Sequence, residues 1–157
     1  MDQIQIDKIK DLIEYERNRK SPPISFPKLP DLPGKRYTDK DFFELEKDNL
    51  WKKTWLLAGH LDEIPERGCY KLWEKTGQPV ILVRKNKDEV AAYYNMCRHR
   101  GAAIVREDYG KTKSLLCGYH GWKYNLDGDL VGKRDPQDFV DFDDSCRSLH
   151  KIKIELL

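Results

Sequence analysis

Two thiols and two imidazoles are the side chains of this sequence whose types and spacing could do chemistry together. They form two short clusters, Cys97-x-His99 and, after the 17 residues 100–116, Cys117-x-x-His120. A glycine closely follows each histidine, at positions 101 and 121, and glycine permits tight loops in which the backbone approaches an inorganic group. Thiolate and imidazole both bind transition metals. The pattern therefore predicts a metal centre and not an acid–base active site.

The mixed ligand set indicates which metal centre this is. In one type of [2Fe–2S] cluster, two cysteines bind one iron and two histidines bind the other, so each loop would supply one sulfur and one nitrogen. A tetrahedral zinc site is the alternative, but zinc loops usually pair ligands as C-x2–4-C or H-x3–5-H. A chance arrangement of buried cysteines and histidines is a second alternative. The one-residue gap in Cys97-x-His99 favours the cluster.

A few other residues have weaker claims to metal chemistry. His60 and Asp62 have the H-x-D spacing of a facial-triad iron site, with His150 as the candidate third ligand. Cys69 and Cys146 have no second ligand nearby in the sequence, so we expect ordinary thiols there. Three arginines near the first cluster form either a cationic rim that guides a redox partner or a solvated surface: Arg98, Arg100 and Arg106.

Length and charge argue against several classes of protein. The 157 residues suit one domain with appendages, and the formal net charge is only +2, so we expect no nucleic-acid partner. No stretch approaches the ~18 consecutive apolar residues of a membrane span, and the first residues lack the basic and apolar regions of a signal peptide. We therefore expect a cytoplasmic protein without a membrane partner, with its four cysteines free or metal-bound.

The first third of the chain is predicted to form a helix, an extended connector and a second helix. Apolar residues at a helical period predict an amphipathic helix over residues 4–19, which needs a partner surface. Five prolines between residues 21 and 34 predict an extended connector. Thr38 and Asp41 resemble a capping box, which predicts a second helix over 39–51 with Phe42, Leu45 and Leu50 on its apolar face.

Beyond residue 51 the apolar period becomes that of strands, so the main domain is predicted to be antiparallel β. Turns are expected at 86–88 and 127–128. The chain stops inside the apolar alternation of Ile152, Ile154 and Leu156, which predicts that the natural chain continues beyond Leu157. The expected strands are 54–58, 69–74, 80–84, 90–95, 114–116, 123–125 and 149–157.

Both clusters resemble the cluster loops of Rieske non-haem iron ring-hydroxylating oxygenases, in their large α subunit. The resemblance lies in CRHRGA at 97–102 and CGYHGWKY at 117–124. It extends upstream to Trp51, Trp55 and GHLDEIP at 59–65, and it covers about residues 35–157. The leader before the first strand favours the oxygenase subunit over a small Rieske ferredoxin, which remains the alternative together with a zinc-stapled binding module.

The resemblance implies a mainly β fold, a Rieske-type antiparallel β-sandwich with the cluster loops at one tip, preceded by N-terminal helices. Residues 1–35 would be the helix and Pro-rich connector, and residues 36–157 the Rieske domain. The [2Fe–2S] cluster would be bound by Cys97, His99, Cys117 and His120.

The same resemblance implies a role in an oxidoreductase, either a monooxygenase or a dioxygenase. Electrons would come from a reductase or ferredoxin and pass to a mononuclear Fe(II) in a C-terminal catalytic domain. That domain is absent from these 157 residues and would belong to this chain or to a neighbouring subunit of a homo-oligomer. Alone, the chain would only transfer electrons.

The chain differs from the respiratory type of Rieske protein around the cluster. That type bridges its loops with an extra disulfide, whereas this chain has Ala102 and Tyr119 at the corresponding positions. Trp122 replaces a serine donor, while Tyr124 remains as a hydroxyl donor. Fewer hydrogen bonds to sulfur stabilise the reduced state less, which predicts a potential in the lower part of the Rieske range.

Overall fold

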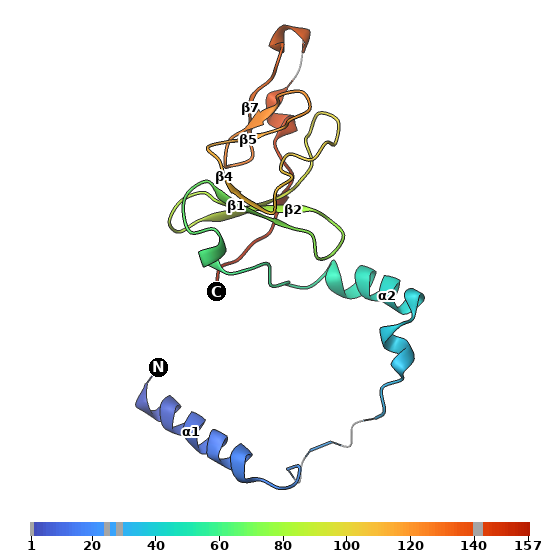
Figure 1. Ribbon diagram of the computed structural model, residues 1–157, viewed down its shortest axis with the longest axis vertical. Coiled ribbons are helices and arrows are strands. Elements are labelled where there is room, and N and C mark those ends of the chain that lie inside the picture. Colours follow the sequence, from blue (N-terminus) through green and yellow to red (C-terminus); the bar gives the residue numbers. More distant parts are fainter. Residues whose placement is uncertain (1, 24–25, 28–29, 140–142) are drawn as a thin grey trace. The chain divides into compact units, whose positions relative to one another are not determined.

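The computed structural model describes residues 2–23, 26–27, 30–139 and 143–157. The chain divides into two compact units, Met1–Phe43 and Glu44–Leu157, which are drawn in one colour gradient in Figure 1. The division expected from the sequence, after residue 35, stays a prediction.

The first unit contains the expected N-terminal helix, α1 (Gln3–Asn18). Asp2 caps this helix, because its carboxylate accepts from the Gln5 amide at 2.8 Å while the Gln5 side chain accepts from the Asp2 amide. No residue of α1 is buried, so its apolar stripe is not covered within this unit. None of the described helices is long and apolar enough to cross a membrane.

The proline-rich connector follows α1. Residues 24–25 and 28–29 of this predicted connector lie outside the described residues, and the described part of 22–33 contains neither helix nor strand. A 3-10 turn at Gly34–Tyr37 ends it.

The second helix spans nearly the predicted residues, but its last turn is π-helical and a different residue caps it. The α-helix α2 spans Lys40–Glu46, and a π-helical turn continues it over Lys47–Trp51. The prediction that Thr38 caps this helix is wrong. Asp39 accepts from the amides of Asp41 and Phe42 at 2.9 and 3.1 Å, because its carboxylate stands one residue nearer to the first helical turn.

Two antiparallel sheets form the second unit (Figure 1). The larger sheet has the order β4-β1-β2-β3-β8, and the smaller one has the order β5-β6-β7. The predicted mainly β fold is therefore confirmed, as are the expected strands at 69–74, 80–84, 90–95, 114–116 and 123–125. The bounds are β1 Cys69–Trp73, β2 Val80–Arg84, β3 Val90–Tyr94, β4 Tyr109–Lys111, β5 Leu115–Leu116, β6 Lys123–Tyr124, β7 Leu130–Gly132 and β8 Lys151–Ile152.

Four points of the strand prediction need correction. Residues 54–58 form no strand, and the Ala58 carbonyl accepts instead from the Lys71 side chain at 3.1 Å. The sequence analysis missed β4, where Gly110 lies under the Tyr70 ring and a Cβ at 110 would stand 2.6 Å from ring carbons, and it also missed the three-residue β7. Of the predicted strand 149–157, only residues 151–152 form a strand, β8, which pairs with β3 at two positions.

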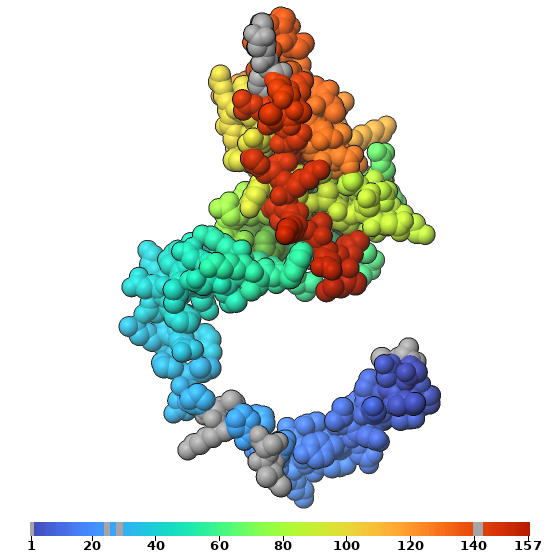
Figure 2. All heavy atoms as spheres, turned by 180° about the vertical axis from the view of Figure 1, so that it is seen from behind, coloured from blue at the N-terminus to red at the C-terminus, as the bar shows by residue number. Residues whose placement is uncertain are grey.

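A buried strand, β2, divides the core in two. Its residues face alternate sides of the sheet, as successive side chains in a strand do, and all five are buried. Ile81 and Val83 face the main core, which the large sheet shares with residues of the small sheet such as Leu115 and Trp122. Val80 and Leu82 face a smaller core on the other side, against Ala92 with Ile152 and Ile154 at its margin. In the space-filling view the red C-terminal residues lie on the surface of this unit beside the yellow-green strands (Figure 2).

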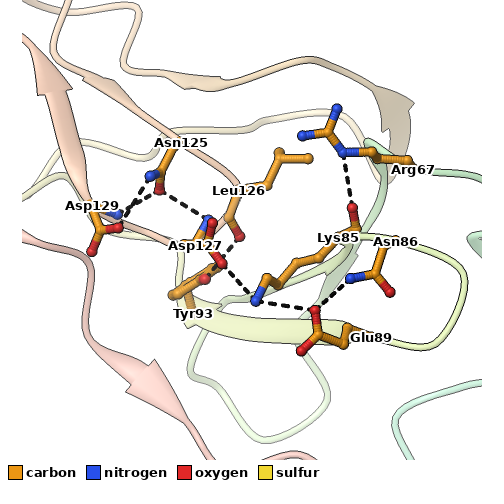
Figure 3. A network of polar contacts seen from close by, with 9 residues as sticks. All are labelled: Arg67, Lys85, Asn86, Glu89, Tyr93, Asn125, Leu126, Asp127 and Asp129. Atoms are coloured by element: carbon orange, nitrogen blue, oxygen red, sulfur yellow. Dashed lines mark hydrogen bonds and ion pairs between the residues drawn. The ribbon is translucent and has the colours of Figure 1, made fainter.

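The β6–β7 hairpin is fastened to the large sheet at its turn (Figure 3). The Tyr93 hydroxyl donates to the Leu126 carbonyl at 3.0 Å, and Lys85 pairs with Asp127 at 2.6 Å. Gly128, at φ +86°, lies against the Tyr93 ring, where a Cβ would stand 2.5 Å from a ring carbon. The predicted turn at 127–128 is thus confirmed, and it joins the small sheet to strand β3 and the end of strand β2 of the large sheet.

Candidate metal centre

The first predicted ligand loop turns back on itself between Cys97 and Ala102. The Cys97 amide donates to the Ala102 carbonyl at 2.8 Å, and the Gly101 amide donates to the Cys97 carbonyl at 2.9 Å. Gly101 has a φ of +74°, which is a conformation that glycine adopts without the penalty paid by other residues.

The second loop repeats this backbone arrangement twenty positions later. The Cys117 amide donates to the Trp122 carbonyl at 2.8 Å, and the Gly121 amide donates to the Cys117 carbonyl at 3.0 Å. Gly121 has a φ of +68°. Cysteine and glycine therefore occupy equivalent positions in both loops, whereas the histidine stands one residue later in the second.

Both loop cysteines are buried and carry free thiols. The Tyr124 hydroxyl lies 3.3 Å from Cys97 Sγ, and the Arg98 amide donates to the oxygen of that hydroxyl at 3.0 Å. Because the phenol oxygen accepts from Arg98, its own hydrogen remains available for a Cys97 thiolate. Burial raises the pKa of the Cys97 thiol, the Tyr124 hydroxyl opposes that rise, and the neighbouring Cys117 thiol adds to it. The hydroxyl of Tyr124 thus lies beside the Cys97 sulfur, and its role as a donor to the cluster stays a prediction.

The two histidines also meet. The ring centroids of His99 and His120 are 4.6 Å apart, and the rings are inclined at 67°. Burial lowers the pKa of His99, and the charges of His120, Arg100 and Arg147 lower it further. The neutral imidazole is the form that binds metals. His99 Nδ1 is buried and has no hydrogen-bond partner in the described part of the chain, as expected of a nitrogen reserved for a metal.

Aromatic rings surround His99. The Trp122 ring, which is 1% exposed, stacks on the imidazole with centroids 4.8 Å apart and planes 9° apart. The Phe139 ring meets His99 edge-on at 6.0 Å. Trp122 therefore belongs to the main core and also covers one face of this imidazole.

The geometry suits a centre with two metal positions. The thiols lie together, the imidazoles lie together, and each loop contributes one of each. No group of three or more His, Cys, Asp and Glu side chains among residues 2–23, 26–27, 30–139 and 143–157 is placed to hold a single metal ion. The paired donors fit a binuclear cluster with two sulfur and two nitrogen ligands.

The weaker facial-triad candidate finds no support in the structure. His60 Nδ1 accepts from the Asp62 amide at 3.3 Å and caps a 3-10 turn at Leu61–Glu63. His150 is exposed, and its carbonyl accepts from the Tyr94 amide. The described residues thus do not bring His150 together with His60 and Asp62 as a metal site.

The remaining candidates lie outside the centre or at its margin. Cys69 is half-buried in β1, and the Cys146 thiol lies 3.2 Å from a carboxylate oxygen of Asp143. Arg98 reaches the Cys146 carbonyl at 3.4 Å, while Arg100 and Arg106 are exposed. A guiding role of these arginines stays a prediction.

The sequence analysis missed Asn95 as a residue of the site. It is 5% exposed, and its side chain makes three hydrogen bonds to the backbone of residues 104 and 105, beyond the first loop. The signal was a polar amide residue at the end of the predicted strand 90–95, two residues before the first cysteine. Phe139 was also missed, because nothing in its local sequence points to a histidine forty residues away.

Two antiparallel sheets with twin loops that join two thiols and two imidazoles define an iron–sulfur domain of mixed ligation. A family model described as "Rieske [2Fe-2S] domain" matches residues 54–143. The chain belongs to this family, and its cofactor is the Rieske [2Fe–2S] cluster. The resemblance inferred from the two loops is confirmed.

The relatives are oxygenase subunits. The chain is 41% identical over 95 residues to the α subunit of benzene 1,2-dioxygenase of Pseudomonas putida, covering 60% of this chain and 21% of the relative. It is 34% identical over 125 residues to the oxygenase subunit of carnitine monooxygenase of Escherichia coli K12, covering 79% of this chain and 33% of the relative.

Solved structures agree with these sequence matches. A quaternary ammonium Rieske monooxygenase with a bound inhibitor superposes with a TM-score of 0.73 at 28% identity, covering 83% of this chain and 40% of that one. A naphthalene 1,2-dioxygenase variant with bound phenanthrene gives 0.70 at 30% identity, covering 76% and 27%. The chain thus spans between about a fifth and a third of the curated relatives named here.

Proposed function

We propose that Cys97, His99, Cys117 and His120 bind the Rieske cluster and that this chain is the electron-relay portion of an oxygenase α subunit. The observation that carries the proposal is the pair of loops with matched backbones, which bring the two thiols together and the two imidazoles together. In this proposal residues 36–157 are the Rieske domain, residues 1–35 precede it, and the catalytic domain is not among the 157 residues.

When bound, the cluster supplies one-electron redox chemistry at a potential set by its ligands and their hydrogen bonds. The residues of the chain prepare the site for it. The lowered pKa of His99 keeps that imidazole neutral at neutral pH, the Tyr124 hydroxyl is placed to donate to the Cys97 sulfur, and the Trp122 and Phe139 rings keep water from one side of His99.

The partners follow from the relatives. We propose a reductase or ferredoxin as electron donor and, as acceptor, a mononuclear Fe(II) in a catalytic portion of this chain or of a neighbouring subunit. Both curated relatives described above are named as subunits of oxygenases. One solved quaternary ammonium Rieske monooxygenase is described with inter-subunit electron transfer, which supports the neighbouring-subunit arrangement.

A single-turnover experiment tests the proposal. Chemically reduced 157-residue protein is mixed with oxygen and either benzene or carnitine, the compounds in the names of the two relatives. We expect reoxidation by transfer of one electron and no hydroxylated product, whereas a longer chain that includes the catalytic portion forms product from its own substrate. Stoichiometric product from the 157 residues alone would contradict the proposal and would require a second iron site within them.

A further inference from the structure

The two ligand loops are closed in different ways. The second loop lies between β5 and β6, and the residues that flank it, Leu116 and Lys123, pair in the ladder of the small sheet. The first loop follows β3, but residues 103–108 form no strand. No ladder therefore closes the first loop.

The side chain of Asn95 closes it instead. Its Oδ1 accepts from the amides of Ile104 and Val105 at 2.9 and 3.0 Å, and its Nδ2 donates to the Val105 carbonyl at 2.8 Å. The Asn95 backbone is itself fixed, because its amide donates to the Pro79 carbonyl at 2.8 Å. The Asn95 carboxamide thus both accepts from and donates to the backbone beyond the loop, as the backbone of a neighbouring strand would.

We infer that Asn95 is a positioning residue for the metal centre, fixing the first loop so that Cys97 and His99 face Cys117 and His120. The inference rests on the proposed ligand role of these four residues. Asparagine suits the task because its short side chain carries an acceptor and a donor, whereas an ionised aspartate only accepts. At 5% exposure, water does not readily replace a lost bond, so the loss of the amide leaves backbone groups unpaired.

The test compares Asn95→Ala with Asn125→Ala. Asn125 is a matched control, since its Oδ1 also accepts from two backbone amides, those of Asp127 and Asp129, but it lies in the β6–β7 hairpin. Hydrogen exchange of the amides at 104 and 105 is measured together with the electron paramagnetic resonance spectrum and midpoint potential of the iron-loaded protein. We expect Asn95→Ala to raise exchange at 104 and 105 at least about tenfold and to change the g values and the potential. Asn125→Ala should leave all three as in the unaltered protein.

If Asn95→Ala does not fold, Asn95→Asp tests the positioning role of Asn95. It keeps the two accepted hydrogen bonds but sets a carboxylate oxygen against the Val105 carbonyl, so the g values and the potential should again change. Unchanged exchange would overturn the inference. So would raised exchange with unchanged g values and potential, because Asn95 would then only stabilise the fold. Absence of iron and sulfide from the unaltered protein would instead refute the proposed function, while the exchange data would still show whether Asn95 closes the loop.

Discussion

The two ligand loops have the same backbone turn but depend on different parts of the molecule. The second loop is part of a hairpin, and the ladder on either side of it fixes its ends. The first loop receives support from that hairpin, since Tyr124 contacts the Cys97 thiol and the Arg98 amide, and Trp122 stacks on His99. The comparison teaches that equal backbone geometry can arise from local pairing in one loop and from long-range side-chain contacts in the other.

Loss of a cluster ligand should have the largest effect of the substitutions considered, and the loss of bound iron should be equal for the two loops. We expect Cys117→Ser or Cys97→Ser to reduce the bound iron from about two per chain to nearly none, because two thiolates are required on one iron. Cys146→Ser is the matched control, since this thiol is exposed and outside the centre. Iron and acid-labile sulfide analysis measures the outcome, and a Cys117→Ser variant with full iron content would show that this residue is not a ligand.

Removal of Trp122 should show how far the first loop depends on the second. Trp122→Ala removes a fully buried ring, which costs about 3–5 kcal/mol of unfolding free energy in a typical core. Trp55→Ala removes a ring that is 66% exposed and should change stability by less than about 0.5 kcal/mol. Chemical denaturation measures both, and equal effects of the two substitutions would contradict the central position of Trp122.

The two loop glycines should respond alike if the loops are equivalent. A Cβ at Gly101 or Gly121 meets only side-chain carbons of Met96 or Arg134, at 3.9 and 3.8 Å, so the cost of Gly→Ala is mainly that of the left-handed conformation. That cost is about 1–2 kcal/mol for an L-residue. Thermal unfolding of the two alanine variants should give matching losses, and a loss at one position only would break the equivalence.

The smallest predicted effect concerns the hydroxyl of Tyr124. Tyr124→Phe keeps the buried ring but removes the donor 3.3 Å from Cys97 Sγ. If that hydrogen bond favours the reduced state by about 1 kcal/mol, the midpoint potential falls by roughly 40 mV. Tyr37→Phe is the control, because that ring is exposed and lies outside the ligand loops. Redox titration followed by absorbance gives both values, and an unchanged potential in Tyr124→Phe would mean that the hydroxyl does not act on the cluster.

The sequence was sufficient where chemistry and local geometry lie close together in the chain. Cysteine, histidine and glycine at fixed short spacing identified both loops, and alternating apolar residues identified the central strands β1, β2 and β3. The turn at 127–128 followed from Asp127 and Gly128 for the same local reason.

The parts that sequence reasoning missed depend on contacts between distant residues. Asn95 bonds residues 104 and 105, and Phe139 meets His99 from forty positions away, so neither role has a local pattern. Strand β4 was missed because it is short and contains Gly110, a residue that strands usually avoid but that the Tyr70 ring requires here. The capping error arose because Thr38 and Asp39 are both good capping residues and only the backbone path selects between them.

The most direct test of the mixed-ligand Rieske centre is metal analysis of freshly isolated protein, combined with electron paramagnetic resonance after reduction. The account predicts about two irons and two acid-labile sulfides per chain. It also predicts a signal on reduction whose average g lies below that of clusters bound by cysteine alone, because two imidazole ligands replace two thiolates. Stoichiometric zinc without labile sulfide would contradict the account.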